Sequence, residues 1–238
     1  MKKIFKLLGI IPFIAVIGFT MFACNKSRGS SNNSDSDSSN SSRGEGKILN
    51  NPEALKEYLD SQPTNSPNNP IKVTMSINKL MIPKIKEVLT TTGKYVNLNL
   101  TGNALKEIPD NAFSECKTLV GIIIPNSVTR IETDAFSCCT SLTSITIPNS
   151  VTIIGVGAFF YCIELNNVTI PDSVTYLVGT SFLNCPKLTS VTFQGTITYL
   201  GNSHSAFLGD LDKKYSEGGI GTYTTTAPVN EDSKWTKQ

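Results

Sequence analysis

Four cysteines that recur at a constant spacing along the sequence are the side chains best suited to carry chemistry. A row with a fixed step can bind metal, form disulfides or fill a core as thiols. Metal sites usually hold paired ligands close in sequence and a histidine. Strands about 4.8 Å apart would place the Cβ atoms at the edge of disulfide geometry. We therefore favour a ladder of small buried thiols, with metal binding and disulfides as alternatives. The four are 23 residues apart: Cys116, Cys139, Cys162 and Cys185.

The other reactive side chains do not form a recognisable catalytic set. Cys138 is expected at the surface, where it could pair, react or remain a thiol. His204 is the single histidine and is expected in an exposed loop; a hydrolase would have to use it. Glu132 and Asp134 occur in one repeat only and are expected to be solvated. The glycines near Gly218 favour hairpin turns over a phosphate-binding loop. We predict no enzyme, no catalytic residue, no cofactor and no metal.

Composition limits the classes of protein and of partner. The chain has 238 residues, 39% hydrophobic and 17% charged, which argues against a wholly disordered chain and a polytopic membrane protein. Its net charge is +2, but the first 23 residues hold three lysines and no acid, so 18 basic and 19 acidic residues remain after them. We therefore expect no nucleic-acid partner.

The amino terminus has the pattern of an export signal. Two lysines precede an apolar run over residues 7–23, which is the charged and hydrophobic order of such signals. Cys24 follows at once, and the string MFACNKS resembles a bacterial lipoprotein signal, in which the cysteine is lipidated. Ala23 fits that pattern, whereas Met21 and Phe22 depart from it. The resemblance implies that lipid on Cys24 holds the chain at a membrane; an uncleaved signal anchor is the alternative.

A polar stretch over residues 24–46 separates this signal from the rest. It is nearly all Ser, Asn, Gly, Asp and Arg, with no apolar side chain to bury. Such a composition cannot offset the entropy of ordering, and we predict a flexible tether.

A 23-residue repeat is the most specific signal in the sequence. Beside the cysteines, three further columns keep the same step. Each unit alone buries too little apolar surface, so the units must stack into a solenoid. A fifth, partial unit begins at Gln194 and places Phe207 25 residues after the preceding phenylalanine. The columns are Phe113, Phe136, Phe159 and Phe182; Leu119, Leu142, Leu165 and Leu188; and Pro125, Pro148 and Pro171.

Each unit contains two extended segments. Strings such as TSITI alternate apolar and hydroxyl residues, which predicts a half-buried strand. Proline ends that strand because it cannot donate to a ladder, and Asn-Ser or Asp-Ser makes a turn. Val151 and Ile154 then mark a second short extended segment. An Ala-Phe pair with the cysteine three residues later closes the coil.

The pattern Leu-x-x-Ile-x-Ile-Pro, Val-x-x-Ile, Ala-Phe and Cys resembles the BspA-type leucine-rich repeat of bacterial surface lipoproteins. The resemblance covers roughly residues 98–207, and the ending GGIGTYTTTAPVNEDSKWTKQ resembles a tail of some such proteins. It implies an exported lipoprotein of the outer membrane or cell surface. It also implies an adhesin-like role, binding host extracellular matrix or other bacteria.

The sequence thus predicts a mainly β fold, a leucine-rich-repeat solenoid of about four to five turns with a small α/β amino-terminal cap and a β-hairpin carboxy-terminal cap. In the first cap we predict helices over 52–59 and 79–89, the second beginning near Pro83, and a strand over 71–75. Residues 95–100 would be the first sheet strand, and 222–226 with 234–236 the closing hairpin. The predicted domains are signal 1–23, tether 24–46, cap 47–97, solenoid 98–210 and cap 211–238.

Two outward-facing sets are the candidate partner-binding residues. On the first extended segment the outward residues are small and rich in hydroxyls, although Thr and Ser also suit any solvated strand. On the second segment the column contains tyrosine and arginine, which are enriched among binding anchors; ordinary cross-strand packing is the alternative. The candidates are Ser144, Thr146, Asn167, Thr169, Ser190 and Thr192 on the first, and Arg130, Tyr176 and Tyr199 on the second.

These observations predict a lipid-anchored surface protein that binds a protein or other macromolecule and performs no covalent chemistry. Many tethered copies would raise avidity where single affinities are weak. The alternative is a periplasmic or membrane-attached scaffold without an adhesive role.

Overall fold

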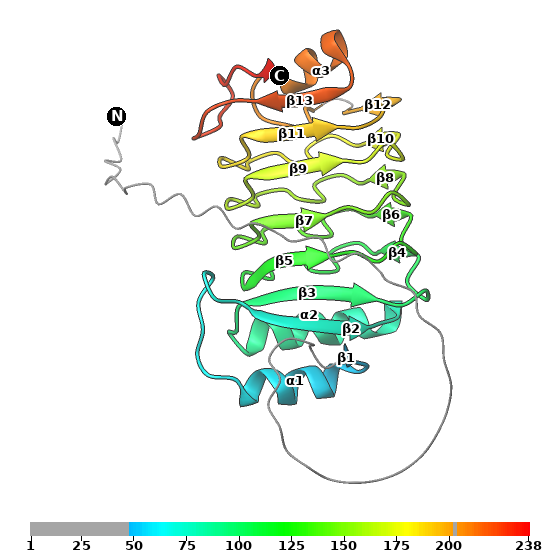
Figure 1. Cartoon of the computed structure of the whole chain (residues 1–238), viewed down its shortest axis with the longest axis vertical. Coiled ribbons are helices and arrows are strands. Elements are labelled where there is room, and N and C mark those ends of the chain that lie inside the picture. The colour runs from blue at the N-terminus through cyan, green and yellow to red at the C-terminus, as the bar shows by residue number, and fades with distance from the viewer. Residues whose placement is uncertain (1–47, 202–203) are drawn as a thin grey trace, which may run out of the picture. The chain divides into compact units, whose positions relative to one another are not determined.

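The computed structural model describes residues 48–201 and 204–238. The predicted signal, the predicted tether and Cys24 lie outside these residues. The described residues belong to one compact unit, in which turns of chain stack from an amino-terminal cap to a carboxy-terminal cap (Figure 1).

The amino-terminal cap alternates strands and helices. The side chain of Asn51 accepts a hydrogen bond from the Ala54 N–H at 2.7 Å and so begins the first helix, as the sequence predicts. Leu55 and Leu59 on that helix are buried. The elements are β1 (Ile48–Leu49), α1 (Pro52–Ser61), β2 (Ile71–Ser76), the short 3-10 helix η1 (Lys79–Met81), α2 (Ile82–Thr91) and β3 (Val96–Thr101).

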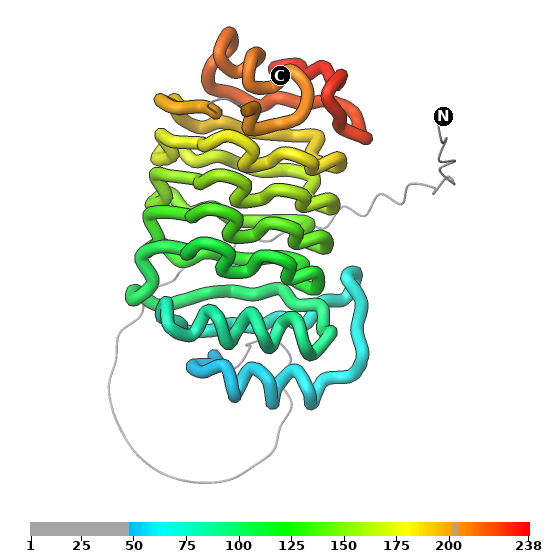
Figure 2. Tube along the Cα trace, turned by 180° about the vertical axis from the view of Figure 1, so that it is seen from behind, coloured from blue at the N-terminus to red at the C-terminus, as the bar shows by residue number. Residues whose placement is uncertain are grey.

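The strands of this cap extend the sheet of the solenoid. β1, β2 and β3 pair in parallel in that order, and α1 and α2 lie together behind them (Figures 1 and 2). The strand expected over residues 95–100 is present as β3, but the expectation that it is the first strand is wrong, because β3 is the third strand of its sheet. A helical crossover lets β1 and β2 continue the parallel pairing downward.

Each turn beyond the cap has three walls. The long-strand wall carries β5 (Leu119–Ile123), β7 (Ser144–Thr146), β9 (Asn167–Ile170) and β11 (Ser190–Phe193). The short-strand wall carries β4 (Glu107–Ile108), β6 (Arg130–Ile131), β8 (Ile153–Ile154), β10 (Tyr176–Leu177) and β12 (Tyr199–Leu200). The phenylalanine wall contains residues 112–116, 135–139, 158–162 and 181–185.

The short-strand wall confirms the repeat directly. Its five strands form one parallel sheet in the order β12-β10-β8-β6-β4, and partners are offset by one period. Arg130 pairs with Ile153, for example, and Tyr176 with Tyr199. Residues with the same place in the repeat therefore lie above one another.

The long-strand wall divides into two sheets. The first has the order β1-β2-β3-β5-β7, and the second contains β9 and β11 with the strands of the carboxy-terminal cap. The uniform repeat did not predict this division, which falls between β7 and β9.

The core is a continuous stack of phenylalanine rings. The ring centroids of successive turns are 4.9–5.4 Å apart and the rings are within 12° of parallel. Each ring is at most 1% exposed. The last member joins the stack despite its longer spacing, at 5.1 Å from the fourth. These rings belong to Phe113, Phe136, Phe159, Phe182 and Phe207.

Two backbone positions in every turn have a left-handed conformation. They recur at the 23-residue step, and only one of the eight residues is glycine, the residue that adopts such a conformation without a steric penalty. These positions make the tight corners of the phenylalanine wall. The first column is Asn111, Asp134, Gly157 and Thr180, and the second is Glu115, Cys138, Tyr161 and Asn184, with φ between 54° and 65°.

The carboxy-terminal cap reverses the direction of the chain. β13 (Gly221–Thr224) runs antiparallel to β11 and pairs with β14 (Thr236–Lys237), which confirms the predicted hairpin. The helix α3 (Leu211–Gly218) was not predicted, and Gly218 ends this helix instead of lying in a hairpin turn. The Tyr215 hydroxyl on α3 donates to the Gly195 carbonyl at 2.9 Å and accepts from the Ile197 N–H at 2.8 Å, so α3 is bonded to the last turn.

Candidate functional site

The cysteine ladder forms part of the core. All four cysteines are free and buried, which agrees with the favoured interpretation of buried thiols. Each thiol after the first donates to the phenylalanine carbonyl of the preceding turn: Cys139 to Phe113 at 3.1 Å, Cys162 to Phe136 at 3.3 Å, and Cys185 to Phe159 at 3.3 Å. Among residues 48–201 and 204–238, no three His, Cys, Asp or Glu side chains gather where they could hold a metal ion.

Burial keeps these thiols protonated. It raises the pKa of Cys116 and of Cys185 to about 12. The pKa values of Cys139 and Cys162 are raised well above the usual range, mainly by burial. Because the thiolate is the nucleophile and the metal ligand, the ladder is poorly suited to either role.

The other side chains considered for chemistry, Cys138, Glu132 and His204, are not members of the cysteine ladder. Cys138 is half-buried in the second left-handed column. Glu132 accepts a hydrogen bond from Arg130 Nε at 2.5 Å, and this pairing raises the pKa of the arginine. His204 is exposed, as the sequence predicts.

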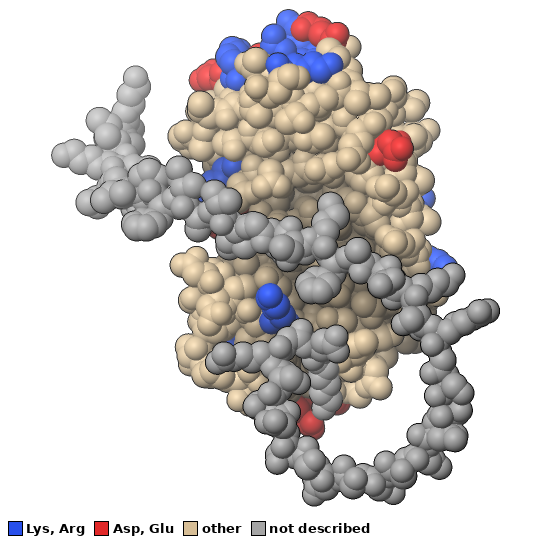
Figure 3. Space-filling model, in the orientation of Figure 1, with Lys and Arg blue, Asp and Glu red and all other residues tan. Residues whose placement is uncertain are grey.

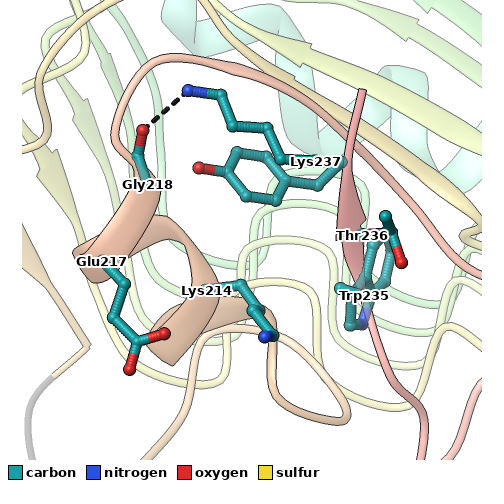
Figure 4. Close-up of a pocket in the computed structure, with 7 residues that line it drawn as sticks. Lys214, Glu217, Gly218, Trp235, Thr236 and Lys237 are labelled. Carbon is teal, nitrogen blue, oxygen red and sulfur yellow. Dashed lines mark hydrogen bonds between the residues drawn. The ribbon is translucent and has the colours of Figure 1, made fainter.

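A shallow cleft lies in the carboxy-terminal cap. Its volume is about 310 Å³, and α3, β13 and β14 supply its walls. Lys237 points across its mouth and donates from Nζ to the Gly218 carbonyl at 2.7 Å (Figure 4). Two lysines, one glutamate and two aromatic residues do not form an acid-base pair or a nucleophile with a base. The lining residues are Lys214, Glu217, Gly218, Tyr223, Trp235, Thr236 and Lys237.

The hydroxyl candidates stand in two rows on the long-strand wall. Asn167 pairs in register with Ser190 and Thr169 with Thr192. The members on β7 and β9 are exposed, whereas those on β11 are half-buried. Thr192 shares a hydroxyl–hydroxyl contact of 2.9 Å with Thr222 of β13, so the cap strand occupies part of its hydrogen-bonding capacity. The structure thus places all six outward and leaves four of them exposed, and of these four Asn167 hydrogen-bonds to Asn166.

The tyrosine candidates form a column on the short-strand wall. Tyr176 and Tyr199 are 46% and 38% exposed, and their ring centroids are 5.9 Å apart at 30°. Ile153 lies beneath Tyr176 in the ladder. Arg130, lower in the same column, is engaged by Glu132. The column is therefore charged at its amino-terminal end and aromatic at its carboxy-terminal end.

Several exposed apolar residues were not among the sequence candidates, and Val156 and Tyr161 are two of them in the middle of the solenoid. Val156 is 44% and Tyr161 46% exposed. Tyr161 occupies the second left-handed column, where the other turns carry Glu115, Cys138 and Asn184. The departure of one tyrosine from a mostly polar column was the signal available in the sequence.

On the face seen in Figure 3, charged side chains are unevenly distributed. In the space-filling view, charged side chains gather over α3 at the carboxy-terminal end, while the face over β9 and β11 is largely uncharged (Figure 3). In the part of the chain that the structure describes, no helix has the length and apolar character needed to cross a membrane.

Comparison with known proteins identifies the repeat. The family model described as the BspA type leucine rich repeat region matches residues 84–210 in six copies. No curated protein matches the chain.

Several solved structures are similar to this chain at low sequence identity. The crystal structure of the pneumococcal vaccine antigen PcpA is 24% identical over 46% of this chain and 28% of its own, with a TM-score of 0.39. A leucine-rich-repeat protein of T. pallidum is 19% identical over 63% of this chain and 84% of its own (TM-score 0.41). A leucine-rich-repeat protein from Bacteroides ovatus is 25% identical over 67% of this chain and 37% of its own (TM-score 0.41). The chain spans less than two thirds of the length of the pneumococcal and Bacteroides proteins.

Proposed function

The chain belongs to the BspA-type leucine-rich-repeat family, whose model covers more than half of it, and from this premise we propose that it is a cell-surface protein that binds other proteins. Leucine-rich repeats generally mediate protein–protein contacts and are typically non-enzymatic scaffolds. The extended walls of stacked turns supply a binding surface of the kind that solenoids use.

One observation carries the proposal: the stacked, exposed pair Tyr176 and Tyr199. Two aromatic rings on neighbouring strands, with Ile153 below them, form an uncharged patch that water solvates poorly. Tyrosine provides large contact area and a hydroxyl at low entropic cost, and it is enriched among residues that dominate binding energy. We propose this patch as the anchor of the interface.

The hydroxyl rows supply a second surface for the same role. Ser144, Thr146, Asn167 and Thr169 are exposed and uncharged, and they can exchange hydrogen bonds with a partner chain. They lie on the long-strand wall, whereas the tyrosines lie on the short-strand wall. A partner that contacts both must wrap around an edge of the solenoid, and the tyrosines are our first choice.

We further propose that lipid on Cys24 anchors the chain to the membrane and that the domain faces outward as an adhesin toward host matrix or other bacteria. Many copies tethered to one membrane can contact the same partner surface at once, which raises avidity without adding a contact to any single copy.

Binding and its location are tested with a shared set of variants. The purified chain is used to pull down extracellular-matrix proteins, and Tyr176→Ala with Tyr199→Ala should weaken capture by at least about tenfold, as expected for truncated interface anchors. Tyr161→Ala is the matched control, because it removes a tyrosine of equal exposure from a different wall. If the unmodified chain, the double tyrosine variant and the Tyr161→Ala control capture a matrix protein equally well, the binding site would be assigned to the hydroxyl rows instead. If the unmodified chain captures no matrix protein, adhesion to host matrix would be refuted.

Anchoring and exposure are tested in cells. Cys24→Ser should release the protein from the membrane fraction, because serine cannot accept the thioether-linked lipid. Protease added to intact cells should digest the domain. Protection in intact cells, with digestion after lysis, would favour a periplasmic scaffold instead.

A further inference from the structure

The division of the long-strand wall falls in the middle of the solenoid. β5 pairs with β7 and β9 pairs with β11, both in parallel. β7 and β9 belong to different sheets, although they occupy equivalent places in adjacent turns. We call the boundary between β7 and β9 the seam.

Backbone hydrogen bonds at the entry to each strand show the same break. The Thr143 N–H donates to the Val120 carbonyl at 2.8 Å, and the Thr189 N–H donates to the Asn166 carbonyl at 3.0 Å. The equivalent bond, from the Asn166 N–H to Thr143, is absent from the hydrogen bonds of the described residues. The pairing is therefore regular between β5 and β7 and between β9 and β11, and it is interrupted at the seam between them.

Solvent reaches the core side of the wall at the seam. Ile145, the inward residue of β7, is only partly buried. Its equivalents Ile122, Val168 and Val191 are at most 2% exposed. The residue type does not explain the greater exposure of Ile145, because the equivalent residue in β5, Ile122, is also isoleucine and is buried.

The sequence of β9 accounts for the weak pairing. The neighbouring turns enter this strand with Thr143-Ser144 and Thr189-Ser190, whereas this turn has Asn166-Asn167. The Thr143 hydroxyl donates to the Val120 carbonyl of the turn below. The two asparagine side chains instead hydrogen-bond to each other, and asparagine is disfavoured in strands.

The other two walls remain bonded at the same level. On the short-strand wall β8 and β10 pair in register. On the phenylalanine wall the Phe159 N–H donates to Ser181 at 2.8 Å and the Tyr161 N–H donates to Leu183 at 3.0 Å. An opening at the seam is thus restrained from behind, which is the arrangement of a hinge.

We propose that the solenoid bends at the seam: β7 and β9 separate and close while the short-strand and phenylalanine walls stay hydrogen-bonded, and Asn166-Asn167 sets this motion. The exposed rows on β7 and β9 lie on either side of the seam, so bending changes their spacing and the curvature of the long-strand wall. The proposal does not depend on the identity of any partner.

Hydrogen exchange of the full chain, followed by mass spectrometry, tests the motion. Backbone amides in peptides covering 166–170 should exchange at least about tenfold faster than those covering 189–193, because local opening without global unfolding governs exchange at weakly bonded sites. Peptides from the other walls at the same level, 152–154 and 175–177, should remain protected. Equal protection of 166–170 and 189–193 would overturn the hinge.

A double substitution tests the cause. Asn166→Thr with Asn167→Ser restores the residues of the flanking turns and should slow exchange over 166–170 to the rate of 189–193. The matched control, Thr189→Asn with Ser190→Asn, introduces the pair one turn higher and should speed exchange over 189–193. Unchanged exchange at 166–170 in the restored variant would overturn the assignment to these asparagines.

Discussion

The ladder thiols make stability sensitive to high pH. Their pKa values are raised in the folded chain, to about 12 for Cys116 and Cys185, so between pH 9 and 12 the folded state holds protons that the unfolded state loses. The resulting stabilisation is complete below pH 9 and disappears as pH rises through this window. Urea unfolding across pH 7–11 should show a falling free energy of unfolding above pH 9. Cys185→Ala should reduce the slope, and an unchanged slope would contradict this account.

Thr180 carries a local backbone strain. It has φ of 65°, and a β-branched residue is disfavoured in this region, whereas Asn occupies the equivalent position at Asn111. Thr180→Asn should therefore raise the free energy of unfolding by about 1 kcal/mol. The reciprocal Asn111→Thr, at an exposed side chain, should lower it by a similar amount. Chemical denaturation measures both, and a loss of stability in Thr180→Asn would show that its methyl packing outweighs the strain.

At the scale of elements, a buried hydroxyl on α3 bonds this helix to the last turn of the solenoid. Tyr215 is 6% exposed and bonds two backbone groups of the last turn. Tyr215→Phe keeps the ring against Phe193 but leaves the Gly195 carbonyl and the Ile197 N–H without this partner. We expect a loss of about 1–3 kcal/mol, measured by thermal unfolding. Tyr199→Phe, at an exposed ring, is the control and should be near neutral.

The sequence predicts elements well where the repeat or a cap residue specifies them. The phenylalanine and cysteine columns, the short strands and the start of α1 at Asn51 follow from spacing and from side-chain chemistry. α3 was missed because LDKKYSEG has few apolar residues, and its packing depends mainly on Leu211 and Tyr215. The seam was missed because TSITI and NNVTI share the same alternation of apolar residues. The sequence places the hydroxyl rows and the tyrosine column on separate extended segments of the repeat, and the structure shows these segments on two different walls.

At the scale of the molecule, each turn is a removable unit. Contacts between neighbouring turns dominate a solenoid, so deletion of residues 125–147, one full period, should leave a cooperatively folding protein of lower melting temperature and smaller denaturant dependence. Deletion of residues 125–135, about half a period, breaks the register and should prevent stacking. Circular dichroism with thermal and urea unfolding distinguishes them. Similar behaviour of both deletions would contradict a modular stack.

The short β14 at the edge of the carboxy-terminal cap has a consequence for growth. Parallel windings offer unpaired backbone groups at their ends, where another copy could continue the coil and build a filament. β13 lies between β11 and β14, so the strand at the edge of this sheet is β14, which has only two residues; such a short edge strand offers little backbone for pairing. The molecule is thus protected at this end from indefinite end-to-end polymerisation, a hazard that its internal regularity would otherwise create.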